Sequence, residues 1–192
     1  MVGWLGLAGC QLKRPDFPPN RMIEPQLATV PASGSTAPAA AAIRLLETQA
    51  RTHIGRRLLH QRADGELIED AVWRWSSAPD RYLDTALRLA FESSADIRLV
   101  DSMNVPVLAV TLLAWQLEGD NDTRLSAAIE LRLTGTDRRV HTQVIRADEA
   151  VSGGLPGTLS VAAGRLLSRL ASEASKQVVA ESSIAPGKTP GG

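Results

Sequence analysis

The stretch RRLLHQRADGELIEDAVWRWSSAPDRYLDTALRLAFES, residues 56–93, decides the fold. Asp64-Gly65 divides its first half into two extended-looking runs, and Asp-Gly is a strong signal for a β-hairpin. In the second run Trp73 and Trp75 are two residues apart, and because side chains alternate along a strand, both tryptophans lie on one face. The stretch therefore predicts a hairpin whose second strand leads straight into the next element.

That next element is predicted to be an amphipathic helix over residues 80–93. Ser77 can cap its start, Pro79 suits the first turn, and the Asp80 carboxylate complements the positive end of the helix dipole. The apolar positions recur at helical spacing and form a stripe of Tyr82, Leu83, Ala86, Leu87, Ala90 and Phe91. This stripe marks the side of the helix that packs on the core.

Further strands are predicted on both sides of the stretch. Residues 43–50 fit either a strand or a helical turn, with the strand favoured, and residues 95–101 form a short strand candidate. Three longer segments follow in succession: 107–120, 123–135 and 138–150. The first is nearly continuous in apolar residues, which suits a central strand, and the second alternates apolar with polar residues. Successive strands joined by short turns predict an antiparallel meander.

A long helix is predicted over residues 156–180. Its apolar stripe is rich in small residues and consists of Leu159, Ala162, Ala163, Leu166, Leu167, Leu170, Ala171, Ala174 and Val178. The outward positions are Arg165, Ser168, Arg169 and Lys176. Together these elements predict an α+β fold, with a mainly antiparallel sheet and two amphipathic helices packed on one face.

Composition sets limits on the class of protein. The chain has 192 residues, with 21 basic and 21 acidic side chains and a formal net charge of zero. A balanced charge argues against nucleic acid as a partner, since nucleic-acid binding needs a basic surface. One cysteine cannot form an internal disulfide. Beyond the N-terminus no stretch of about 18 uncharged apolar residues suggests a transmembrane helix.

That single cysteine, Cys10, follows Leu7-Ala8-Gly9, a pattern that looks like the lipobox of a bacterial lipoprotein. In such a motif the cysteine sulfur is acylated and Cys10 becomes the new N-terminus. A signal peptide normally begins with Lys or Arg and has about 7 to 15 apolar residues, whereas here nine residues precede Cys10 and none is basic. Either the start is clipped or assigned too late, or the motif is accidental.

Proline and small residues dominate the chain between Cys10 and the first strand. Proline removes a backbone donor and fixes φ, so regular structure is not expected to persist there. The predicted organisation has four parts. They are a partial signal peptide (1–9), a lipidated N-terminus with a flexible Pro/Ala-rich tether (10–42), the α+β domain (43–180) and a disordered tail (181–192).

Residues able to carry chemistry are few. No zinc-site spacing connects the histidines, which we interpret as surface residues: His53, His60 and His141. Three carboxylates near the hairpin turn could be mistaken for an acid/base pair, but we interpret them as the solvated side of a strand: Glu66, Glu69 and Asp70. The sequence therefore predicts no metal, no cofactor and no enzymatic activity.

Two other features have a functional and a structural interpretation. The glycine-rich run Ser152–Gly157 precedes a helix but lacks the Walker pattern and its lysine, so a plain turn before the helix is favoured over a phosphate site. Trp73 and Trp75 fit the core better than a ligand platform, and Trp115 lies inside an apolar strand. Each of these residues is predicted to serve the fold.

The run 56–93, together with the order of the predicted elements, resembles the ABC-type transport auxiliary lipoprotein family. Members of this family accompany MCE-type lipid transport systems such as the paraquat-inducible one. The family pattern is an extended segment, an apolar run ending in tryptophan, small residues, a proline and an amphipathic helix. Its places are filled here by Arg62, Trp75, Pro79, Leu83 and Leu87. The resemblance covers residues 43–180. The signal peptide is shorter than in the family, and its early tyrosine-containing strand has no counterpart in the predicted tether.

The resemblance implies a non-catalytic domain facing the periplasm on a lipid anchor, with palmitate among its acyl groups, at the outer membrane. Gln11, rather than an aspartate, follows Cys10 and fits that location. The implied partners are an MCE-type protein and an ABC permease with its ATPase, and self-association into a homo-oligomer is possible. The alternative function is a lipid carrier that holds an acyl chain in an apolar cavity.

Overall fold

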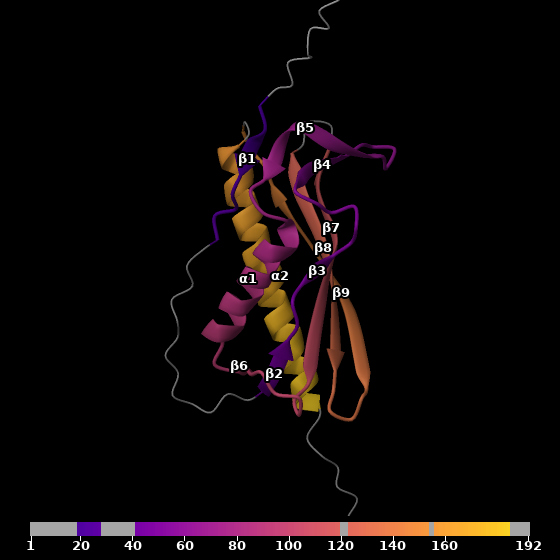
Figure 1. Ribbon diagram of the computed structural model, residues 1–192, viewed down its shortest axis with the longest axis vertical. Helices are drawn as coiled ribbons and strands as arrows, with labels where there is room; N and C mark the ends of the chain where they lie inside the picture. Colours follow the sequence, from indigo (N-terminus) through magenta and orange to yellow (C-terminus); the bar gives the residue numbers. More distant parts are fainter. Residues whose placement is uncertain (1–18, 28–40, 120–122, 154–155, 185–192) are drawn as a thin grey trace, which may run out of the picture.

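The computed structural model describes residues 19–27, 41–119, 123–153 and 156–184. Nine strands and two helices are found in this part of the chain (Figure 1). In chain order they are β1 (Arg21–Ile23), β2 (Ala41–Leu45), β3 (Gln49–Ala50), β4 (Arg57–Gln61), β5 (Leu67–Trp75), α1 (Pro79–Ser93), β6 (Ile97–Leu99), β7 (Val107–Glu118), β8 (Arg124–Thr134), β9 (Val140–Ala150) and α2 (Gly157–Ile184). The predicted α+β class is confirmed.

The predicted meander is present as β7, β8 and β9, which pair antiparallel over almost their whole length. Ile129 at the middle of β8 lies opposite Leu112 of β7 and Ile145 of β9. The inward positions of β8 are buried, as its alternation predicts: Leu125, Ala127, Ile129, Leu131 and Leu133. The apolar period of two therefore fixed the register of this part of the sheet.

The rest of the sheet corrects the expectation of a mainly antiparallel arrangement. β2, β3 and β4 all pair parallel with β7, β6 pairs parallel with β2, and β1 pairs parallel with β5. Parallel neighbours need a long crossover, and α1 together with β6 supplies one between the β4–β5 hairpin and β7. The sheet is therefore mixed.

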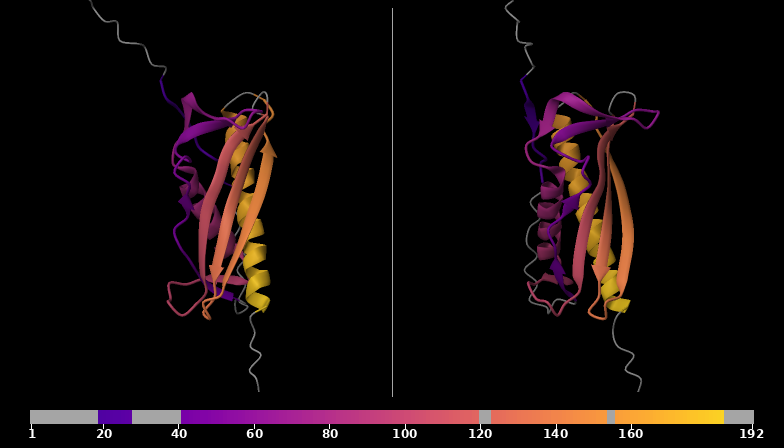
Figure 2. Two further views of the ribbon diagram at one scale, coloured as in Figure 1. Left: turned by 90° about the vertical axis from the view of Figure 1, so that its right-hand side faces the viewer. Right: turned by 45° about the vertical axis from the view of Figure 1, so that its right-hand side comes forward.

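Both helices lie on the same side of β7, β8 and β9 (Figure 2). α2 packs along β8 and β9, and α1 packs against α2. Every residue of the predicted stripe on α2 is buried, from Leu159 to Val178. Its many alanines bring the helix close to the sheet, so that the core forms between the strands and the two helices.

The hairpin and the start of α1 agree in part with the prediction from the sequence. β4 and β5 pair antiparallel around Gly65, whose φ of +87° explains why glycine occupies this turn. α1 begins at Pro79 as predicted, but Ala78 is the N-cap residue and no side chain caps the helix. The predicted cap at Ser77 is wrong, because Ser77 lies one residue before the N-cap position. Its backbone N–H donates to the Tyr82 hydroxyl oxygen at 2.7 Å.

The domain is larger than predicted at both ends. β1 lies inside the range assigned to the tether, where Ile23 is buried and β1 pairs with β5, so the tether assignment is wrong for residues 19–27. β2 begins at Ala41 and α2 continues to Ile184, beyond the predicted end at residue 180. The predicted signal peptide, Cys10, the rest of the tether and most of the tail lie outside the described residues.

Trp75 and Trp115 form the aromatic centre of the core. Their exposed fractions are 0% and 1%, and their rings meet edge to face with centroids 5.5 Å apart. Trp73 is partly buried against the same core, as the alternation along β5 predicts.

Replacing Trp75 with alanine should therefore lower the free energy of unfolding by about 3–5 kcal/mol, since it empties a large buried volume. Trp73→Ala is the matched control on the same strand and should lower it by clearly less. The denaturation midpoints of both variants measure this difference, and equal small losses would contradict the packing described for Trp75.

Candidate functional site

Residues 19–27, which we call the N-terminal strap, are held on the domain by backbone pairing. Arg21, Met22 and Ile23 are in register with Trp73, Arg74 and Trp75 of β5. The backbone N–H of Ser76 extends the pairing by donating to the Ile23 carbonyl oxygen at 2.9 Å. The Ile23 side chain is 2% exposed, so the strap contributes to the core as well as to the sheet.

A hydrogen-bonded cluster around Tyr82 fixes the next part of the strap. The Tyr82 hydroxyl donates to the Glu24 carboxylate at 3.0 Å and also contacts the Ser76 hydroxyl. Burial raises the pKa of Tyr82; the Ser76 hydrogen bond opposes this rise and the Glu24 carboxylate adds to it. Tyr82 therefore keeps its proton at neutral pH and continues to hold Glu24.

The strap then crosses α2 at very close range. The backbone N–H of Gln26 donates to the Ser160 carbonyl oxygen at 3.1 Å, and the Ser160 hydroxyl donates to the Glu24 carbonyl oxygen. A Cβ at Gly164 would lie 1.8 Å from the Gln26 carbonyl oxygen. Only glycine leaves room for the strap at this turn of α2.

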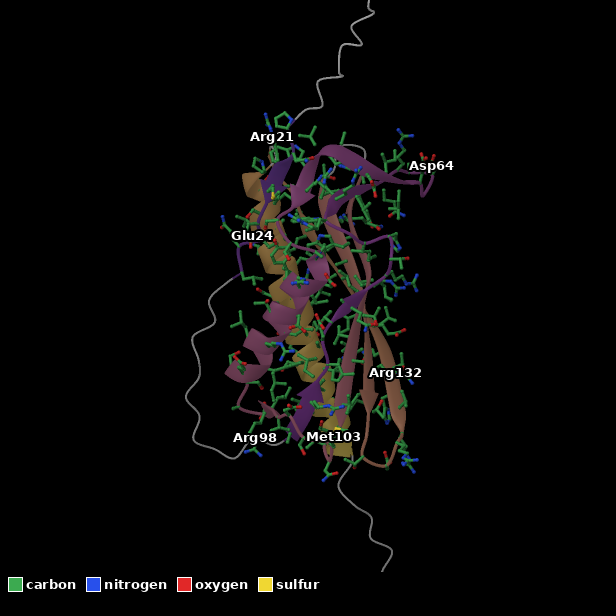
Figure 3. The ribbon with its side chains drawn as sticks, viewed as in Figure 1. Arg21, Glu24, Asp64, Arg98, Met103 and Arg132 are labelled. Atoms are coloured by element: carbon green, nitrogen blue, oxygen red, sulfur yellow. The ribbon has the colours of Figure 1, made fainter. Side chains whose placement is uncertain are left out.

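The strap determines where the chain leaves the domain on its N-terminal side. Arg21 lies at the end of the molecule that also carries the β4–β5 hairpin (Figure 3). Residues 11–18 separate Cys10 from the first described residue. Because Cys10 lies outside the described residues, its acylation stays a prediction.

Asp70 differs from the solvated carboxylate that the sequence suggested. Its Oδ1 accepts from the backbone N–H groups of Val72 and Trp73 at 2.7 Å each, and its Oδ2 lies 3.0 Å from His60 Nε2. Burial alone would raise the pKa of Asp70, but the bonds from Trp73, Val72 and His60 outweigh it and the pKa is lowered. Asp70 and His60 are thus a half-buried pair that shapes β5.

The other candidates are solvated, as predicted. His53 is exposed between β3 and β4, and His141 on β9 is exposed and faces Glu181 of α2 at 3.2 Å. Glu66 pairs with Arg62 at 3.2 Å and Glu69 with Arg57 at 2.8 Å, all of them at the surface. The described part of the chain holds no group of three or more potential metal ligands.

The glycine-rich run and the hollows beside α2 give no sign of a ligand site. α2 begins at Gly157, directly after the run, whose residues 154 and 155 lie outside the description. A groove of about 250 Å³ lies between α1 and α2, and a slot of about 170 Å³ lies between α2 and β8–β9. Both are smaller than common small-molecule pockets of roughly 300–1,000 Å³. Neither α1 nor α2 has the length and apolarity to cross a bilayer.

Comparisons with known proteins show the fold. No protein-family model and no curated protein matches the chain in sequence. Protein XCC0632 from Xanthomonas campestris, of the DUF330 family, superposes with a TM-score of 0.70 at 15% identity, covering 86% of this chain and 100% of that one. A second, uncharacterized protein superposes at 0.63 and 11% identity, covering 85% and 98%. At such identities these likenesses show a shared fold alone.

Gly164→Ala tests the close contact between the strap and α2. Alanine favours helices over glycine by about 1 kcal/mol, but here its Cβ meets backbone, so we expect a net loss of about 1–3 kcal/mol in unfolding free energy. Limited proteolysis should also cut faster near residues 19–27. Gly157→Ala, where nothing lies within 4 Å, is the control. Equal stabilisation by both substitutions would contradict the close approach.

Asp70→Asn tests the carboxylate that organises β5. A carboxyl whose pKa is lowered on folding stabilises the protein above its ordinary value of 3.8, and this stability is lost as the pH falls through the folded pKa. At pH 6 we expect Asp70→Asn to lower the unfolding free energy by about 1–3 kcal/mol. The difference from the unsubstituted protein should shrink toward pH 2. Glu66→Gln, at an exposed pair, should change little at any pH; a constant difference for Asp70→Asn would contradict the assignment.

Proposed function

We propose that this chain is a lipid-anchored, non-catalytic protein of the bacterial envelope, attached through Cys10 to the periplasmic face of the outer membrane. The docked strap is the observation that carries the proposal. It begins at residue 19, so nine residue steps connect the domain to Cys10. An extended chain of that length reaches roughly 30 Å at most, so an acylated Cys10 would keep the domain beside the membrane.

The internal structure supports an interaction role over catalysis or lipid carriage. The core between sheet and helices is filled by aliphatic and aromatic side chains, and the apolar hollows beside α2 are small. The carboxylates near the hairpin are engaged in ion pairs or in backbone hydrogen bonds. We therefore favour an interaction module over the alternative of an acyl-chain carrier.

The finer proposal is that the protein is an auxiliary component of an ABC/MCE-type lipid transport system. It rests on the sequence resemblance carried by residues 56–93. The hairpin, Trp75, Pro79 and the buried stripe of α1 follow one another in the order of the family pattern, which supports the proposal. The proposed partners are an MCE-type protein and an ABC permease with its ATPase.

Acylation of Cys10 is tested by metabolic labelling. With the protein expressed from its native locus, labelled palmitate should be incorporated, and Cys10→Ala should abolish the label and release the protein from the membrane fraction. Separation of inner from outer membranes locates the anchored form. A natural full-length protein that stays soluble and unlabelled would contradict the anchor.

The transport role needs a different readout. Crosslinking in cells followed by purification of the anchored protein should yield an MCE-type protein encoded beside it, together with the permease. Recovery of neither, under conditions that recover a known complex of this type, would contradict the transport assignment while leaving the lipid anchor in place.

A further inference from the structure

Three arginines gather on the outer side of β1, β5 and β4. Met22 of β1 is in register with Arg74 of β5, and Arg74 lies opposite Arg57 of β4, so these side chains form a row across three strands. Arg56 joins the row, because its Nη2 lies 3.6 Å from the Met22 sulfur. We call this surface, made of Met22, Arg56, Arg57 and Arg74, the arginine face.

Most of the positive charge on the arginine face is not neutralised. Arg57 pairs with Glu69 at 2.8 Å, but Arg56 and Arg74 meet no carboxylate among the residues that the structure describes. Arg56 Nε donates to the Trp75 carbonyl oxygen at 3.3 Å, and Arg74 Nε is buried without a described partner. Arg56 is exposed and Arg74 is half-buried, and neither guanidinium group has a counter-charge among the described residues, so both can pair with an anion from outside.

Apolar side chains are exposed among these charges. Met22 is 57% exposed at the β1 end of the arginine face, and Leu67, which lies near Arg56 and Arg57, is 40% exposed. An open hollow of about 380 Å³ adjoins the face; it is lined by Arg56, Arg57, His53 and Leu67 and also by Glu69, the carboxylate that pairs with Arg57. Cationic groups mixed with exposed apolar side chains are typical of surfaces that lie in a membrane interface.

The position of the arginine face indicates a membrane as its partner. It lies on the strap and the strands that hold the strap, at the end where the chain continues toward Cys10 (Figures 1 and 3). The sequence between Cys10 and the strap contains two further cations, Lys13 and Arg14, and one carboxylate, Asp16. Twelve residue steps separate Cys10 from Met22, so a membrane that held Cys10 would lie within roughly 40 Å of the arginine face.

We propose that the arginine face binds the phosphate groups of anionic lipids in the membrane that carries the anchor. The location of this membrane rests on the proposed function; the lipid-binding chemistry of the face does not. Arg56 and Arg74 would bind phosphate oxygens while Met22 and Leu67 enter the headgroup region. A cationic surface beside a lipid anchor strengthens attachment and also fixes the orientation of the domain.

The test uses the full chain with Cys10→Ser, which cannot be acylated, and vesicles of phosphatidylcholine with or without 30% phosphatidylglycerol. Co-flotation should require the anionic lipid and should weaken at high salt. Because an arginine near an anionic surface contributes roughly a factor of five, Arg56→Gln with Arg74→Gln should lower the partition constant by about 25-fold.

The matched control removes the same charge elsewhere. Arg132 and Arg146 are exposed on β8 and β9, outside the arginine face, and their replacement by glutamine should change binding by less than about twofold. If the double variant folds poorly, the single substitution Arg56→Glu repeats the comparison, because Arg56 is exposed. Its control is Arg132→Glu, which is also at an exposed position.

Several results would overturn the proposal. They are equal binding to neutral vesicles, equal losses in the two double variants, and full competition by millimolar inorganic phosphate at constant ionic strength, which would make free phosphate the ligand. The flotation assay needs no acyl chain. A negative result would therefore contradict lipid binding by the arginine face, whereas absence of palmitate labelling at Cys10 would contradict the anchor.

Discussion

The edge-to-face contact between Trp75 and Trp115 connects the parts of this fold that are distant in sequence. Trp115 belongs to β7, the strand on which β2, β3, β4 and β8 all pair. Trp75 ends β5, is in register with Ile23 of the strap, and accepts no substitute of smaller volume without leaving a void. Its backbone N–H also donates to the Arg56 carbonyl oxygen at 2.7 Å. Hairpin, strap and central strand are therefore held at one point.

The sequence predicted the elements whose apolar pattern is local and repeated. α1, α2 and the meander each carry a long stripe of apolar residues with a single sequence period. Composition and the spacing of these residues were therefore enough to predict them. The parallel pairings were missed because each depends on segments far apart in the chain. The strap was missed because it offers only two buried residues, Ile23 and Pro25, within a proline-rich segment, which is too little for any period. Met22 and Ile23 form an apolar pair there and are the signal that marks the site.

The same limits apply to the candidate site. The sequence identified Cys10 by its motif, but the role of Gly164 depends on contact with Gln26, which no local pattern encodes. Likewise, Asp70 resembles its neighbours Glu66 and Glu69 in sequence and differs because two backbone N–H groups and the His60 ring converge on it. The arginines at 56, 57 and 74 form one surface because β4 and β5 fold back on each other and β1 joins them.

Docking of the strap would restrict how the domain moves on the proposed Cys10 anchor. On the proposed Cys10 anchor, a free tether from Cys10 to Ala41 would allow the domain to turn in any direction, whereas a connection that ends at residue 19 would bring one end of the long axis to the membrane. In that orientation the connections between β6 and β7 and between β8 and β9 lie at the opposite end, where Met103 is 80% exposed (Figure 3). The outward side chains of β8, among them Glu130 and Arg132, are then free of both the membrane and the helices. Under the proposed transport role, a partner that reaches from the opposite membrane would meet that end and this face of the sheet.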